Sequence, residues 1–175
     1  MILFNRFLRY AGVFVLLGGA FACSERQQVT ESTPDIGQEL VETPTLSVYK
    51  SPTCGCCGGW IEHIEAAGFD TTVYHPADMS RIKMDNAISP SYQSCHTAIS
   101  RDGHVFEGHI PAKYIRQFLE HPPSDAIGLA VPAMPAGSPG MEIADRFSPY
   151  QVLLLKRDGS SEIFAHVEAQ EEQYQ

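Results

Sequence analysis

The stretch LSVYKSPTCGCCGGWIEHIEAAG, residues 46–68, decides the fold class of this 175-residue chain. Residues 46–49 form a short run of β type, and the cysteine- and glycine-rich segment 54–59 follows. From Trp60 onward, apolar residues recur at helical spacing. Gly68 is suited to end that helix, because glycine adopts the left-handed backbone at low cost. This order predicts that the cysteines lie at the N-terminus of the first helix.

The rest of the chain alternates strand and helix signals. Strands are predicted over 69–74, 94–100, 105–109, 151–156 and 162–167, with Asp-Gly turns at Asp102-Gly103 and Asp158-Gly159. Helices are predicted from Asp78 to about residue 87, and from Pro111 at the first helical position to Pro122-Pro123. These elements predict an α/β fold, a thioredoxin-like sandwich with an additional C-terminal β-hairpin.

Residues 128–141 are predicted to form a long loop. The segment is rich in proline, glycine, alanine and methionine and has no periodicity. A loop of this length inside a compact domain is uncommon and is usually functional. We therefore expect it to contribute to a site.

The first 22 residues have the build of a signal peptide. Arg6 and Arg9 precede an apolar run over 10–22, which is short for a membrane span. The exit Ala20-Phe21-Ala22-Cys23 fits an A-x-A cleavage site and also resembles a lipobox. Either cut exports the protein and leaves Cys23 at the new N-terminus. We expect a periplasmic protein, attached to the membrane only if Cys23 carries a lipid.

Composition divides the remaining chain into a tether, a domain and a tail. Residues 23–45 are rich in Glu, Gln, Thr and Pro and are predicted to be a flexible tether, a packed first strand being the alternative. The folded domain is predicted over 46–167, and a polar tail over 168–175. The net charge of −9 argues against nucleic acid and anionic lipid surfaces as partners, since both select basic surfaces.

Three sulfurs lie within the four residues Cys54-Gly55-Cys56-Cys57. Cys54 and Cys57 have the C-x-x-C spacing of a thioredoxin-type dithiol, which needs only two sulfurs. Three neighbouring thiolates repel one another unless a cation lies between them, and soft thiolate ligands select Cu(I) or zinc. A structural disulfide with a spare thiol is the alternative, because exported proteins keep disulfides.

Cys95-His96 adds a second pair of metal-ligating side chains. Neighbouring side chains of a regular strand point to opposite faces, so both can reach one metal ion only at a strand end or a bulge. A small buried core residue is the alternative for Cys95. A lone histidine at the end of a strand is more often a surface residue than a ligand, so His109 is not included in the predicted site.

Met134 and Met141 lie in the proline-rich loop, where a methionine cannot pack on a helix face. This placement makes them candidate thioether ligands for copper. Filling of the core is an equally good interpretation for either residue.

Four motifs occur in order along the chain: Lys50-x-Pro52-x-Cys54-Gly55-Cys56-Cys57-x-x-Trp60, Ser94-Cys95-His96-Thr97-Ala98, Glu107-Gly108-His109-Ile110-Pro111, and the run from Gly128 to Glu142. In this pattern the chain resembles the exported metal-binding family of the copper-resistance protein CopG. The resemblance implies a thioredoxin-like fold, a periplasmic location and copper held by the C-x-C-C sulfurs. It also implies that the sulfurs and the copper exchange electrons.

Carried over by position, the resemblance makes Cys54, Cys56 and Cys57 the copper thiolates. Cys95 and His96 would then complete or flank the site. One residue departs from the family pattern: Ala133 stands where the resemblance leads us to expect glycine.

Three functions follow as hypotheses. In the first, the protein binds copper ions and supports copper resistance by sequestering them, handing them to periplasmic copper-handling or redox proteins, or changing their oxidation state. In the second, it is a thiol–disulfide oxidoreductase whose catalytic pair is Cys54 and Cys57. In the third and weaker one, zinc is held structurally by Cys54, Cys57, Cys95 and His96. Four thiolates in the domain offer more donors than one ion needs, so we expect more than one Cu(I) per chain.

Overall fold

The computed structural model describes residues 43–174, which belong to one compact unit spanning Leu40–Gln175. The predicted signal peptide, the lipid acceptor Cys23 and nearly all of the predicted tether lie outside the described residues. Within the described range, no helix is long and apolar enough to cross a membrane.

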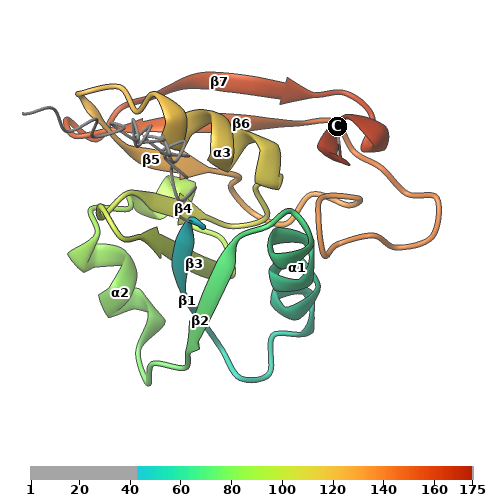
Figure 1. Ribbon diagram of the computed structural model, residues 1–175, viewed down its shortest axis with the longest axis horizontal. Coiled ribbons are helices and arrows are strands. Elements are labelled where there is room, and N and C mark those ends of the chain that lie inside the picture. The colour runs from blue at the N-terminus through green and yellow to red at the C-terminus, as the bar shows by residue number, and fades with distance from the viewer. Residues whose placement is uncertain (1–42, 175) are drawn as a thin grey trace, which may run out of the picture. The chain divides into compact units, whose positions relative to one another are not determined.

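The described chain forms a mixed α/β fold around one seven-stranded sheet of order β2-β1-β3-β4-β5-β6-β7 (Figure 1). The strands are β1 (Thr45–Lys50), β2 (Asp70–Tyr74), β3 (His96–Ser100), β4 (Val105–Glu107), β5 (Ala126–Ala130), β6 (Tyr150–Lys156) and β7 (Ser161–Val167). Strand β1 is parallel to β2, and β4 is parallel to β5, whereas the other neighbours are antiparallel. The last two strands form the expected C-terminal hairpin.

Three α-helices and two 3₁₀ turns connect these strands. The helices are α1 (Gly55–Ala66), α2 (Met79–Asp85) and α3 (Ala112–Glu120), and the turns are η1 (Pro90–Tyr92) and η2 (Gln170–Tyr174). The predicted cap of α2 is confirmed, since the Asp78 carboxylate accepts hydrogen bonds from the backbone N–H groups of Ser80 and Arg81. The helix stop at Gly68 is also confirmed, with a φ of +86°.

Two predicted helix starts were wrong, and one strand was missed. The predicted strands 94–100 and 105–109 each extend two residues beyond β3 and β4. Helix α1 begins at Gly55, five residues before Trp60, because tertiary packing holds the weak helix formers Gly55, Gly58 and Gly59 in its first turns. Pro111 is the N-cap of α3 and not its first helical residue. The predicted loop 128–141 begins inside β5, whose buried apolar residues show no alternation that periodicity could detect.

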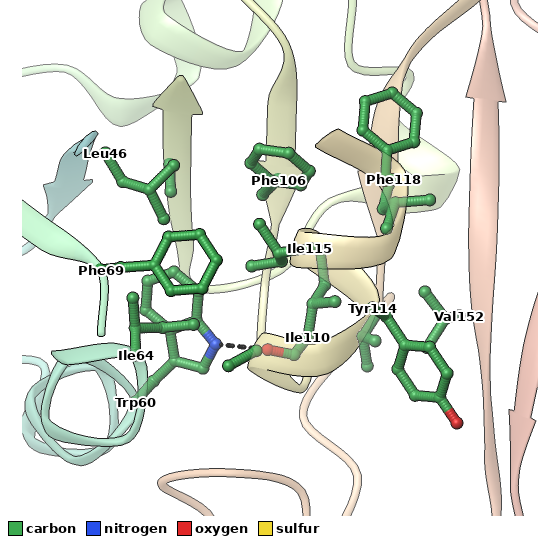
Figure 2. Packing of buried hydrophobic residues seen from close by; sticks show 14 of the residues in the cluster. Leu46, Trp60, Ile64, Phe69, Phe106, Ile110, Tyr114, Ile115, Phe118 and Val152 are labelled. Carbon is green, nitrogen blue, oxygen red and sulfur yellow. Dashed lines mark hydrogen bonds between the residues drawn. The ribbon is translucent and has the colours of Figure 1, made fainter. Parts of the chain in front are cut away.

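The hydrophobic core anchors the helix that carries the cysteines. Trp60 and Ile64 of α1 pack in the same cluster as Phe106 of β4 and Phe118 of α3, and all four side chains are fully buried (Figure 2). The Trp60 indole N–H donates to the carbonyl oxygen of Ile110 at 2.9 Å (Figure 2). Since Trp60 follows Cys57 by three residues, this anchor fixes the first turn of α1.

The polar C-terminal segment packs on the loop that follows β5. Gln173 in η2 is only 1% exposed. Its side-chain amide donates to the carbonyl oxygen of Gly137 at 2.8 Å and accepts from the Tyr150 hydroxyl. These hydrogen bonds hold one end of residues 131–141 against the body of the domain.

Candidate metal centre

The sulfur and imidazole groups meet where three backbone segments come together. The first turn of α1 carries Cys54, Cys56 and Cys57, the residues just before and at the start of β3 carry Cys95 and His96, and the segment after β4 carries His109. The antiparallel pairing of β3 with β1 and β4 brings these segments side by side.

Cys54 and Cys57 form a disulfide, as their spacing predicts, whereas Cys56 and Cys95 are free. Cys54 is the N-cap residue of α1, and Cys57 is fully buried in its first turn. The Sγ atoms of Cys54 and Cys56 are 3.5 Å apart. The positive end of the helix dipole therefore lies at this group of sulfurs.

Cys95 lies at the centre of the arrangement. Its Sγ is 3.4 Å from Sγ of Cys57, 3.0 Å from Nε2 of His109 and 3.3 Å from Nδ1 of His96. Strand β3 begins at His96, so Cys95 lies just before the strand. This is the strand-end position that allows neighbouring side chains to reach one metal ion.

His109 belongs to this site, which the sequence analysis missed. Its Nδ1 is 2.7 Å from the carbonyl oxygen of Pro139, which can only accept, so Nδ1 carries the proton. The unprotonated Nε2 then faces the sulfur of Cys95. A backbone acceptor that fixes the tautomer in this way is the usual support of a histidine that ligates metal.

A signal for His109 was present in the hairpin register. In the structure Thr97 pairs with Glu107 and Ile99 with Val105 around the Asp102-Gly103 turn. The same register, continued by one pair on the same face, places His109 opposite Cys95. Counting outward from a two-residue turn at Asp102-Gly103 places His109 opposite His96, one residue from its place in the structure. The turn therefore indicates that His109 lies near the Cys95-His96 pair, and the observed register identifies Cys95 as its partner.

His96 carries a buried ring nitrogen without a hydrogen-bond partner. Its side chain is fully buried between the rings of Trp60 and His109, at centroid distances of 4.3 and 5.0 Å. Nε2 has no partner among residues 43–174. Nδ1 of the same ring lies 3.3 Å from the Cys95 sulfur. Buried polar atoms are normally satisfied, so the unpartnered Nε2 is a feature that a bound metal ion would explain.

Burial sets the protonation states of these groups. It lowers the pKa of His96 well below its usual value, with the neighbouring His109 and Lys83 lowering it further, and it lowers the pKa of His109 as well. Burial first, and then Cys56, raises the pKa of Cys95 to about 12. Both histidines are therefore neutral and able to ligate, and Cys95 is a thiol whose proton a metal ion must displace.

Once the Cys54–Cys57 disulfide is reduced, two overlapping sets of donor atoms could each hold a metal ion. One set is Cys54, Cys56, Cys57 and Cys95, and the other is Cys95, His96 and His109. Within each set the donor atoms lie within 4.8 Å of one another. Sulfur and imidazole donors without carboxylates suit Cu(I) or zinc and not the hard cations Mg²⁺ or Ca²⁺. Cys95 is common to both sets.

The loop after β5 closes over the first turns of α1. A Cβ atom added to Gly140 would lie 2.5 Å from the carbonyl oxygen of Cys56 and 2.5 Å from the backbone nitrogen of Trp60, so only glycine fits there. Met134 is 48% exposed in this loop and Met141 is partly buried, and their role as copper ligands stays a prediction. Ala133 has a φ of +59°, the left-handed backbone that explains why glycine was expected there.

The chain is similar to one protein family and to solved structures. The family described as "Protein of unknown function, DUF411" matches residues 92–141. A solved structure named "Copper resistance protein copG- Form 2" is 44% identical with a TM-score of 0.68, and the match covers 72% of this chain and 99% of that chain. A second, "Copper resistance protein copG- Form 1", is 43% identical with a TM-score of 0.68, covering 73% and 100%. No curated protein matches the chain.

Proposed function

Because this chain belongs to the family of the copper resistance protein CopG, we propose that it is a periplasmic copper-binding protein that holds Cu(I) through cysteine thiolates. The observation that carries the proposal is the position of Cys95, whose sulfur belongs to both sets of donor atoms. A bridging thiolate lets two or more soft ions share ligands, as several Cu(I) ions in one small site require.

The fold supports the proposed thioredoxin-like character of the domain. A β1–α1–β2 unit with parallel strands is followed by a β3–β4–α3 unit with antiparallel strands. The cysteine motif lies at the N-terminus of the first helix, where the helix dipole favours thiolates. We propose the thioredoxin-like sandwich on these grounds, with β6 and β7 as its C-terminal extension.

Copper redox chemistry can be coupled to the Cys54–Cys57 pair. Two Cu(II) ions would take one electron each from the reduced pair, giving two Cu(I), the Cys54–Cys57 disulfide and two protons. Cys56, Cys95, His96 and His109 are outside the disulfide and would remain as donors. Peptide mapping without reductant should find Cys54 linked to Cys57 in air-exposed apo protein. Four free thiols in the domain would contradict the coupling and leave sequestration alone.

A thiol–disulfide oxidoreductase acting on protein cysteines is the second candidate function. The disulfide in a C-x-x-C motif at a helix N-terminus favours it, with Cys57 buried and Cys54 partly exposed. An enzyme of this kind has no use for the free thiol of Cys95 or for two neutral histidines beside it. Reduction of a protein disulfide at an undiminished rate by Cys95→Ser would favour this candidate.

The location follows from the predicted signal peptide, which lies outside the described residues. We propose export to the periplasm, with a lipid on Cys23 as the only membrane attachment. Periplasmic copper-handling or redox proteins would be the partners that deliver or receive the ion.

The experiment that tests copper against zinc uses the reduced full-length chain under anaerobic conditions. Cu(I) and Zn(II) are supplied together at equal concentration, and the bound ions are counted after desalting. We expect copper to occupy the site because thiolate-rich sites bind Cu(I) more tightly than Zn(II). Predominant zinc at one ion per chain would contradict the proposal and support the structural zinc site.

A further inference from the structure

A buried ion pair lies beside the segment that carries Cys95 and His96. Lys83 of α2 and Glu107 at the end of β4 meet at 2.5 Å between Nζ and Oε1, with side chains only 7% and 0% exposed. Lys83 Nζ also donates to the Thr97 hydroxyl at 3.1 Å. The pair is thus fully enclosed and lies next to strand β3.

The carboxylate of Glu107 binds the chain on both sides of the two ligands. Oε1 accepts from the backbone N–H of Ser94 at 2.6 Å, and Oε2 accepts from the Thr97 hydroxyl at 2.6 Å. Ser94 directly precedes Cys95, and Thr97 directly follows His96. One side chain therefore brackets the Cys95-His96 pair.

The sheet itself does not hold the first half of this bracketed segment. Thr97 is paired with Glu107 in the sheet register, and the pairing of β3 with β1 ends at His96. Ser94 and Cys95 lie before the strand. The bond from Ser94 N–H to Glu107 thus restrains the backbone at the point where Cys95 leaves the sheet.

Stability alone does not account for the pair. Replacing a buried ion pair by apolar side chains of similar volume is often neutral or stabilising, because desolvation offsets the attraction of the charges. An apolar replacement would lose the acceptors for Ser94 N–H and for the Thr97 hydroxyl, and the first of these restrains the backbone beside Cys95.

We propose that Glu107 is a positioning residue that holds Cys95 where it can serve both sets of donor atoms. Cys95 Sγ lies 3.4 Å from Cys57 Sγ and 3.0 Å from His109 Nε2, so a shift of about one ångström toward either set removes it from the other. The copper part of this inference rests on the proposed function, whereas the positioning of the backbone does not.

Two variants differ in whether residue 107 keeps a polar side chain. Lys83→Met/Glu107→Gln removes both charges but keeps a carbonyl oxygen for Ser94 N–H, and Lys83→Met/Glu107→Leu removes the acceptor as well. Neither variant leaves a buried unpaired charge, so we expect both to fold. The first measurement, on the full-length copper-free chain, is amide hydrogen exchange at Ser94. We expect exchange at least tenfold faster in the leucine variant than in the glutamine variant.

The second measurement is the Cu(I) affinity of the two variants, determined by competition with a chromophoric chelator. Each variant is measured with Cys95 present and again with the additional substitution Cys95→Ser. With Cys95 present, we expect the leucine variant to bind about 10- to 100-fold more weakly than the glutamine variant, the usual effect of losing a supporting residue around a metal site. In the Cys95→Ser background the two variants should bind equally.

Three outcomes would be decisive. Equal exchange at Ser94 in the two variants would overturn the inference, whatever the copper affinities. A difference in affinity that persists without Cys95 would also overturn it, because Glu107 would then act on other ligands. If the unsubstituted chain bound no Cu(I), the proposed function would fail, while hydrogen exchange would still decide the role of Glu107.

Discussion

Cys95 and His109 face each other at the open end of the β3–β4 hairpin, with 3.0 Å between Sγ and Nε2. The hairpin register places them opposite one another, and the carbonyl of Pro139 fixes the histidine tautomer from the far side of the ring. A thiol and an imidazole held this way form a ready pair of ligands for a soft metal ion.

His109→Leu tests the ligand that the hairpin register reveals. Leucine fills much of the same volume but offers no donor atom, so the set formed by Cys95, His96 and His109 loses one ligand. Among the Cu(I) ions that the reduced chain binds, we expect the least tightly bound one to be lost, or its affinity to fall at least about tenfold. His166→Leu is the matched control, since that side chain is 54% exposed. Equal affinities in the two variants would exclude His109 from the site.

Cys95→Ser tests the shared ligand. Serine is close in size to cysteine but is a poor ligand for a soft ion, so we expect weaker Cu(I) binding and an unchanged circular dichroism spectrum. The loss should exceed that in His109→Leu, because Cys95 belongs to both donor sets. Cys23→Ser, which removes a thiol outside the domain, is the control. Copper binding that survives the loss of Cys95 would make it a core residue.

Gly140→Ala tests the contact between the loop and α1. Gly140 has a φ of +83°, and an added Cβ would lie 2.5 Å from the backbone of Cys56 and Trp60. Gly159→Ala is a matched control, because Gly159 has a φ of +84° and no atom within 4 Å of the added Cβ.

The control variant Gly159→Ala measures the cost of placing alanine at a positive φ, which is about 1 kcal/mol. We expect Gly140→Ala to lower the free energy of unfolding by at least about 2 kcal/mol, because overpacking adds to that strain. It should also weaken copper binding by moving the first turn of α1. Equal losses of stability in urea titrations of the two variants would show that the loop does not press on the helix.

The pH dependence of copper binding should depend on Cys95. Burial raises the pKa of this thiol to about 12, so near neutral pH the folded, metal-free protein holds the proton that Cu(I) must displace. The Cys95 proton should therefore contribute about a tenfold gain in Cu(I) affinity per pH unit from pH 6 to pH 9, in addition to any contribution from the other thiols of the site. In Cys95→Ser this contribution disappears, so the slope of log Cu(I) affinity against pH should be smaller by one. Parallel pH profiles for the two proteins would contradict this assignment.

The sequence predicted the elements whose signals are local. The Asp78 cap, the Gly68 stop and the two Asp-Gly turns depend on residues within one turn of each other, and the structure has all of them. The disulfide between Cys54 and Cys57 likewise follows from spacing along one turn of helix.

The features that were missed depend on distant contacts. Helix α1 begins in a glycine-rich segment because the loop at Gly140 packs against it, and strand β5 is recognisable only from its burial between β4 and β6. His109 joins the site through the hairpin register and through Pro139, 30 residues away. Helical or strand periodicity contains none of this information, since it reports only on neighbours along the chain.

The most direct test of the account is the number of Cu(I) ions bound by the fully reduced full-length chain. Protein reduced and loaded anaerobically is desalted, and copper is measured by atomic emission against protein by amino-acid analysis. Two overlapping donor sets with Cys95 in common predict two or more Cu(I) per chain, falling in Cys95→Ser. A single tightly bound ion, with the same count in Cys95→Ser, would contradict the shared-ligand site.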